Sequence, residues 1–174
     1  MTGAEPDLAL LALRVITGLT MAAHGLNKFF GGGRIAGTAR WFDSIGMRPG
    51  RVHALLAATT ETVAGLFFAA GLATAFAGAA FVAVMAVAAW TVHRESGFFV
   101  NANGWEYNLV LAAVGVFVAT TGPGAWSLDN LLGMTDALRG WTGLAIALVG
   151  GLLAAVGQLA LFYRPAPAAP PAAA

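Results

Sequence analysis

Four polar residues interrupt apolar stretches of the sequence at positions where they could act together on a small molecule. His24, Asn27 and Lys28 close the first apolar stretch in the run HGLNK, and Glu61 lies inside the second among threonines. Imidazole, amide and ammonium groups donate hydrogen bonds that a carboxylate or a ligand oxygen accepts. An ionisable group inside a membrane-length apolar segment is costly without a partner or a wet cavity. The four residues are therefore candidates for a polar ligand site.

A fifth polar residue, Arg14, lies on the same helical face. The members of this face recur at spacings of three and four, as one side of a helix requires: Arg14, Thr17, Met21, His24 and Lys28. We therefore include Arg14 among the candidate cavity residues. The alternative is a packing seam in which Arg14 and Lys28 extend toward opposite membrane surfaces.

Depth along the two helices predicts the partner of Glu61. At about 1.5 Å per residue, His24 lies roughly 6 Å inside the level of Lys28, Glu61 roughly 12 Å and Arg14 roughly 21 Å. Side chains lean toward the N-terminus of their helix, so on an antiparallel pair His24 and Lys28 lean toward Glu61 while Arg14 leans away. We predict that Glu61 bonds to His24 or Lys28. Arg14 is the competing partner if the helices are shifted by about a turn.

The segment FFVNANGWEYNLVL brings two more polar candidates to the start of a later helix. Glu106 and Asn108 could face the interior at the level of His24. The alternative is a membrane-surface rim, because Trp105 and Tyr107 are typical of aromatic belts.

The three histidines allow a different site. His24, His53 and His93 all fall near one side of the membrane on different helices, and converging imidazoles could ligate a haem. No HxxxH or HxxE spacing supports such a set, and we assign no metal site. Without cysteine the chain has no thiolate ligand, disulfide or catalytic thiol.

Composition indicates that these residues belong to a membrane protein. Hydrophobic residues make up 59% of the 174 residues, charged residues 10%, and the mean hydropathy is +0.77. Soluble domains have about half apolar and a quarter charged residues. The surrounding solvent is therefore lipid, and a formal net charge of +1 gives no basic surface for nucleic acid.

Five segments approach the roughly 20 residues that span a bilayer as a helix. They cover about 8–27, 52–72, 73–92, 105–121 and 141–163, after an N-terminal segment 1–7. We divide the chain into a transmembrane domain 8–139, an additional helix 140–164, and an Ala/Pro-rich tail 165–174 that we expect to be disordered.

Charge predicts the orientation. If the helices alternate, connections 28–51 and 93–104 share one side with the chain end at Arg164, and seven of the nine Lys and Arg residues lie there. We call this the basic side. The positive-inside rule places it in the cytoplasm, with the N-terminus outside. Within the first connection, IAGTARWFDSIGM suits a short interfacial helix.

The additional helix has small residues on one face. Its sequence GLAIALVGGLLAAVG allows close approach between helices, which is how membrane helices associate without a hydrophobic driving force. We predict that it packs on the bundle or on a second copy, through Gly143, Ala147, Gly150, Gly151, Ala154 and Gly157.

Four motifs in order resemble the DoxX family of small bacterial integral membrane proteins. They are LRVITGLTMAAHGLNKFFGG, TETVAGLFFAAGLATAFAG, HRESGFFVNANGWEYNLVL and TGPGAWSLDNLLG. The resemblance covers about residues 8–133. It implies a four-helix core in the bacterial plasma membrane and an association with quinone-linked and sulfur or oxidative-stress redox systems.

We therefore expect an all-α integral membrane bundle, with a four-helix DoxX-like core and a fifth C-terminal transmembrane helix. The expected function is an auxiliary redox subunit that binds a quinone-like molecule and docks catalytic partners on the cytoplasmic side. Self-association is a further expectation. The alternatives are a structural anchor for peripheral enzymes and a small transporter for a weak acid or lipid.

Overall fold

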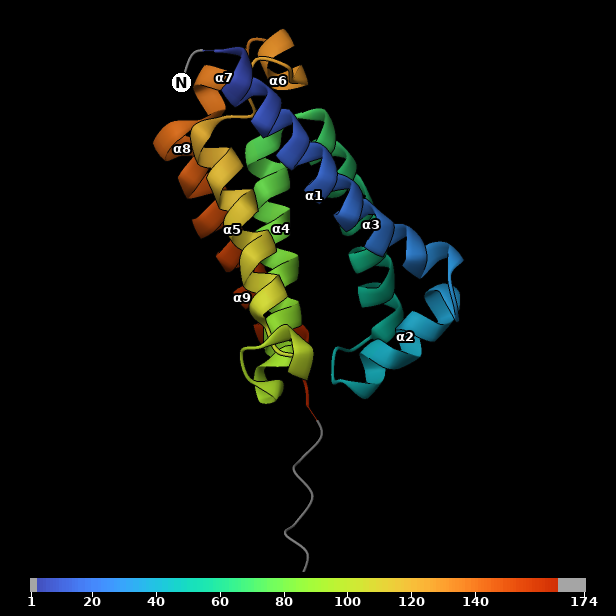
Figure 1. Cartoon of the computed structure of the whole chain (residues 1–174). Coiled ribbons are helices and arrows are strands. Elements are labelled where there is room, and N and C mark those ends of the chain that lie inside the picture. The colour runs from blue at the N-terminus through green and yellow to red at the C-terminus, as the bar shows by residue number, and fades with distance from the viewer. Residues whose placement is uncertain (1–2, 166–174) are drawn as a thin grey trace, which may run out of the picture.

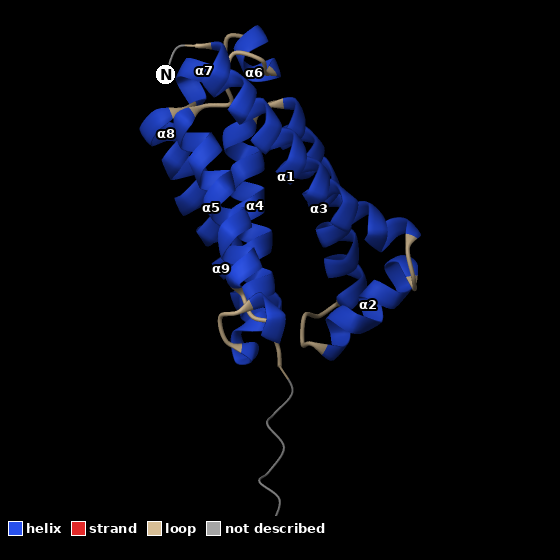
Figure 2. Cartoon of the chain, viewed as in Figure 1, coloured by secondary structure: helices blue, strands red, loops and turns tan. Residues whose placement is uncertain are grey.

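The computed structural model describes residues 3–165, and every regular element in that range is helical (Figure 2). The predicted all-α bundle is confirmed. The predicted disorder of the tail concerns residues that, apart from Pro165, lie outside the described range. In chain order the elements are α1 Ala4–Phe30, α2 Arg34–Ser44, α3 Gly50–Ala70, α4 Thr74–Ala88, η1 Ala89–His93, η2 Arg94–Ser96, η3 Val100–Ala102, α5 Glu106–Thr121, α6 Leu128–Leu131, α7 Thr135–Leu138, α8 Gly140–Leu144, η4 Ala145–Gly150 and α9 Gly151–Phe162.

Four helical stretches are long and apolar enough to cross a membrane: Ala4–Phe30, Gly50–Ala70, Thr74–Ser96 and Gly140–Phe162. The first begins before the predicted residue 8 because Pro6 is tolerated in a first turn and Glu5 and Asp7 favour the N-terminal dipole. The predicted fourth span, 105–121, is the helix α5, which has only 16 residues. At about 1.5 Å per residue it is shorter than the hydrocarbon core.

The helices form two arms that diverge toward one end of the molecule (Figure 1). α1 and α3 pack closely along one arm, and α4 contacts α5 and α9 in the other. Glycines allow the first contact, since a Cβ at Gly18 would lie 2.5 Å from the Gly65 carbonyl oxygen and one at Gly25 2.6 Å from that of Ala58. The short helix α2, in the predicted interfacial segment, crosses the open end and packs on α3.

The two arms join through the α3–α4 turn and α6. Gly71 ends α3 with a φ of 66°, and Asp129 of α6 accepts hydrogen bonds from the backbone N–H groups of Ala73 (2.7 Å) and Thr74 (2.9 Å). This carboxylate therefore caps the start of α4 and stabilises it through the helix dipole. Arg14 of α1 donates to the carbonyls of Ala69 (3.2 Å) and Trp126 (2.7 Å) at the same junction.

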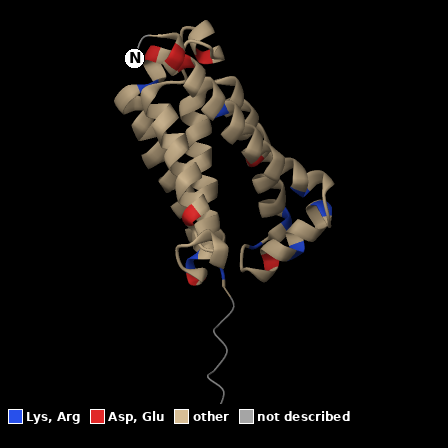
Figure 3. Ribbon diagram, viewed as in Figure 1, with Lys and Arg blue, Asp and Glu red and all other residues tan. Residues whose placement is uncertain are grey.

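Charges separate toward the two ends (Figure 3). Asp and Glu gather around the N-terminal end and α6–α7, while many of the Lys and Arg residues lie on α2 and its surroundings. The basic side inferred from the sequence is thus the end at which the arms diverge. There, residues after α9 pair with the α2–α3 loop, since Met47 and Tyr163 form an antiparallel bridge and the Arg164 N–H donates to the Gly46 carbonyl at 2.7 Å.

The additional C-terminal helix packs on the bundle, as predicted. Gly143, Ala147 and Gly151 of its small-residue face are buried, and a Cβ at Gly151 would lie 2.6 Å from Val82 Cβ. Gly157 differs, because a Cβ there would meet no atom within 4 Å.

This difference gives a prediction for two matched substitutions. Gly151→Ala should lower the free energy of unfolding by about 1–3 kcal/mol, because the new methyl overlaps Val82. Gly157→Ala should raise it by about 0.5–1 kcal/mol, because alanine loses less backbone entropy in a helix. Thermal and denaturant unfolding in detergent would measure both. Equal changes would contradict the described packing of this helix.

Candidate functional site

A cavity of about 900 Å³ lies between the two arms toward the basic side. Ligand pockets have volumes of about 300–1,000 Å³. Small apolar side chains of α4 form much of its wall, among them Ala79, Ala80 and Ala83. Gly150 at the end of η4 and Gly151 and Gly157 of α9 also line it. The lining extends from α1 and α5 to α9, so the cavity reaches both sides of the α3–α4 pair.

An ion pair lines one part of this cavity. Lys28 Nζ of α1 donates to Glu61 Oε2 of α3, and their side chains are 20% and 8% exposed. The predicted pairing of Glu61 with Lys28 is therefore confirmed. The same ammonium lies 3.3 Å from the His24 carbonyl oxygen, one helical turn back. A charged donor and a charged acceptor thus face an otherwise apolar space.

Polar groups from α1 and α5 surround the pair. His24 lines the cavity with its ring centroid 6.4 Å from that of Tyr107. Asn108, which is buried, also lines it, with its amide nitrogen 3.6 Å from Met85 Sδ. The predicted residues His24, Lys28, Glu61 and Asn108 therefore share one cavity. Tyr107 belongs with them, although the sequence pattern favoured an aromatic belt for it.

Three predicted cavity residues lie elsewhere. Arg14 is fully buried at the α3–α4 junction, where its two terminal nitrogens donate to backbone carbonyls, and it neither pairs with Glu61 nor lines the cavity. Asn27 is exposed outside the cavity, since it lies on another face of α1. Glu106 accepts a hydrogen bond from the Val100 N–H at 3.0 Å, which holds its carboxylate over the loop before α5.

The three histidines have separate surroundings. His93 Nδ1 lies 2.7 Å from the Asn103 carbonyl oxygen, and His53 Nδ1 lies 3.1 Å from the amide nitrogen of Gln158. Within residues 3–165, no group of three or more His, Asp or Glu side chains could hold a metal ion.

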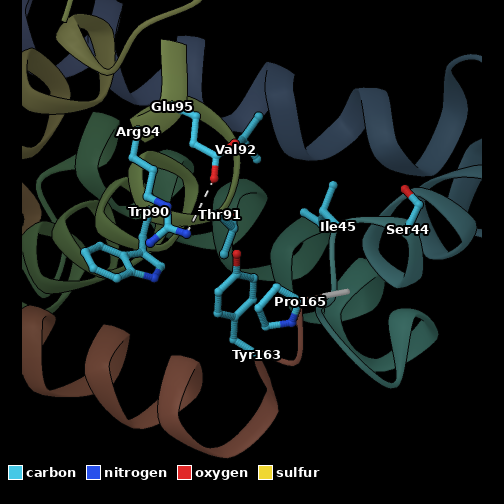
Figure 4. Close-up of a pocket in the computed structure, with 9 residues that line it drawn as sticks. All are labelled: Ser44, Ile45, Trp90, Thr91, Val92, Arg94, Glu95, Tyr163 and Pro165. Carbon is cyan, nitrogen blue, oxygen red and sulfur yellow. Dashed lines mark ion pairs between the residues drawn. The ribbon is translucent and has the colours of Figure 1, made fainter. Parts of the chain in front are cut away.

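Two smaller hollows adjoin the helices. One of about 520 Å³ is lined mainly by apolar residues of α4, α5, η4 and α9, and Asn108 and Met85 line both it and the main cavity. The other, of about 200 Å³, lies at the basic side (Figure 4). There Arg94 stacks on Trp90, 4.6 Å from the ring centroid, and pairs with Glu95 at 3.6 Å. Its acidic and basic groups are already paired, which makes it a weaker ligand site.

The fold and this cavity define a multi-pass helical membrane protein with an internal polar site. The chain belongs to the DoxX family, whose model matches residues 9–94. It is 35% identical over 123 residues to a Bacillus subtilis protein named "Putative oxidoreductase CatD". The aligned region covers 71% of this chain and 86% of the Bacillus subtilis protein. An "Uncharacterized protein" of Haemophilus influenzae is 25% identical over 149 residues, covering 81% and 94%. No solved structure matches the chain.

Proposed function

We propose that this protein is an auxiliary membrane subunit of a redox system and that its cavity binds a quinone-like lipophilic molecule. The observation that carries the proposal is the Lys28–Glu61 pair with His24 and Tyr107 on the wall of a mainly apolar cavity. A quinone has carbonyl oxygens that accept hydrogen bonds and an apolar ring and tail. The relative named as an oxidoreductase adds support for a redox setting.

The proposed binding mode assigns a task to each wall. Lys28 donates to one carbonyl oxygen, because a charged donor forms the stronger hydrogen bond. Tyr107 and His24 lie beside it and can donate as well. The alanine-rich face of α4 contacts the ring and tail. Reduction of a quinone takes two electrons and two protons, and a partner protein at the basic side supplies the electrons.

Binding of a decyl-substituted naphthoquinone to the purified protein in lipid nanodiscs tests the proposal. Trp41 lines the cavity, so its fluorescence should be quenched as the probe binds. Gly157→Phe should abolish binding, because its ring enters open space on the cavity wall. The matched control is Leu153→Phe, at a 66% exposed position of the same helix. Decylnaphthalene, which has no carbonyl, should bind much more weakly.

The other functions predict different results. Equal binding of naphthoquinone and decylnaphthalene, or binding untouched by Gly157→Phe, would contradict the quinone site. A structural anchor would retain peripheral enzymes in a native-membrane pull-down while binding neither probe. A transporter would move a weak acid or a lipid across proteoliposomes. Partner proteins and a second copy of the chain would appear in the same pull-down.

The proposed orientation places the basic side in the cytoplasm of a bacterial cell. Seven Lys and Arg residues lie at that end, so a reporter fused after Arg164 should be active in the cytoplasm. Paired fusions of alkaline phosphatase and green fluorescent protein would measure this. Phosphatase activity of the fusion would contradict this orientation and would place the basic side outside the cytoplasm.

A further inference from the structure

The cavity wall on α9 carries a polar side chain that the binding mode above leaves unused. Gln158 lines the cavity, and its amide nitrogen lies 3.1 Å from Nδ1 of His53 on α3. His53 itself is 1% exposed, and its ring packs edge-on to Phe162 with centroids 5.0 Å apart. Gln158 is therefore held by a buried imidazole at the α9 part of the cavity.

The second nitrogen of this imidazole makes no hydrogen bond of normal length among the described residues. His53 Nε2 is buried without a hydrogen bond among the described residues. A neutral imidazole carries one proton, and the bond that the other nitrogen makes usually fixes its position. Here the bond to Gln158 is the hydrogen bond of normal length that the ring makes among the described residues, beside a weaker backbone interaction with Arg48. The proton can thus sit on either nitrogen, according to which end of the amide faces Nδ1.

Each arrangement presents a different group to the cavity. When the amide nitrogen donates to Nδ1, the Gln158 carbonyl oxygen is available to accept a hydrogen bond. When Nδ1–H donates to that oxygen, the amide NH₂ is available to donate. A quinone carbonyl requires a donor, whereas the hydroxyl of a quinol requires an acceptor. The His53–Gln158 pair can supply both.

We infer that Gln158 binds the second oxygen of the cavity ligand, in both its quinone and quinol forms, and that His53 positions the Gln158 amide. This inference rests on the proposed function and extends it. Lys28 and Gln158 line the α1 and α9 parts of one cavity. The additional C-terminal helix is then part of the binding site.

Two probes separate the second contact from the first. Decylnaphthoquinone has two carbonyls, and a decyl-substituted tetralone has one, which should bind at Lys28. Gln158→Met keeps the length of the side chain without its amide. Gln158→Met should weaken binding of the naphthoquinone and of its quinol about tenfold each and leave binding of the tetralone unchanged. Lys28→Met should weaken binding of all three probes.

His53 is tested as a positioning residue. His53→Phe should weaken naphthoquinone binding less than Gln158→Met does, and should cause no further loss in the Gln158→Met background. Additive losses would assign His53 a separate, structural contribution and overturn its positioning role.

The failures are distinguishable. If the wild-type protein binds naphthoquinone and Gln158→Met does not change the affinity, the second contact is refuted while the proposed function stands. If Gln158→Met weakened binding of tetralone and naphthoquinone equally, the substitution would have changed the shape of the cavity. This result would also refute the second contact. If the wild-type protein binds no naphthoquinone, both the proposed function and this inference fail.

Discussion

Glu61→Ala is expected to lower the free energy of unfolding by about 3 kcal/mol, because removing one partner of a buried ion pair leaves the other charge uncompensated. The charge left behind is Lys28, whose side chain is only 20% exposed. Naphthoquinone binding should weaken as well, since the ammonium loses the carboxylate that holds it on the cavity wall. Urea unfolding and probe titration, both in lipid nanodiscs, would measure the two effects.

Two further variants make this prediction specific to the pair. Glu61→Ala combined with Lys28→Met removes both charges and should recover stability, giving a coupling of at least about 1 kcal/mol relative to the two single variants. Glu106→Ala is the matched control, because this carboxylate accepts a hydrogen bond from the Val100 N–H outside the cavity. It should change stability by about 1 kcal/mol and leave probe binding intact. Additive effects of the Glu61 and Lys28 substitutions would argue against an energetic coupling across the cavity.

Arg14→Met is expected to have the larger effect on stability and none on binding by the folded protein. It removes both hydrogen bonds from the guanidinium to the α3–α4 junction and leaves the Ala69 and Trp126 carbonyls without those donors. The loss should be about 3–5 kcal/mol, because each of the two buried carbonyls left without a donor costs about 1–3 kcal/mol. Unfolding midpoints in denaturant would measure it.

Arg14→Lys distinguishes geometry from charge at this junction. Two separate guanidinium nitrogens reach the two carbonyls, whereas a lysine ends in a single ammonium. Arg14→Lys should therefore retain less than half of the unfolding free energy that is lost in Arg14→Met. Normal stability combined with weaker probe binding in either variant would contradict this prediction. It would indicate that Arg14 contacts the ligand in the cavity, as its position on the helical face predicted.

The pairing of Glu61 with Lys28 was predictable from the sequence because a helix has a fixed rise per residue. Once α1 and α3 are antiparallel neighbours, depth and side-chain lean select the partner. Arg14 has the same spacing pattern, but its partners are backbone carbonyls at a turn and in the segment before α6. Every residue has a backbone carbonyl, so the residue types in the sequence do not indicate which carbonyls accept hydrogen bonds from Arg14.

The α9 wall of the cavity was not predicted, although a signal existed. Gln158 is a polar residue within the predicted 141–163 span, and such residues are candidates for function by the same reasoning that selected Glu61. The small residues of the span indicated packing, which the structure confirms. Gly150 and Gly157 line a cavity instead of packing against a helix, because the two arms diverge beside them. The sequence of one helix does not determine this divergence.

The pairing of Met47 with Tyr163 also has a consequence for biosynthesis. The chain is inserted from its N-terminus, so α1 to α5 reach the membrane before α9 is translated. Until then the space between α3 and α4 lacks its α9 wall. Residues 163–164 then join the loop at Gly46 and Met47, which fixes the end of α9 against α2 and α3. Nascent chains released before residue 164 would therefore lack the α9 wall of the cavity and the contact that holds the end of α9.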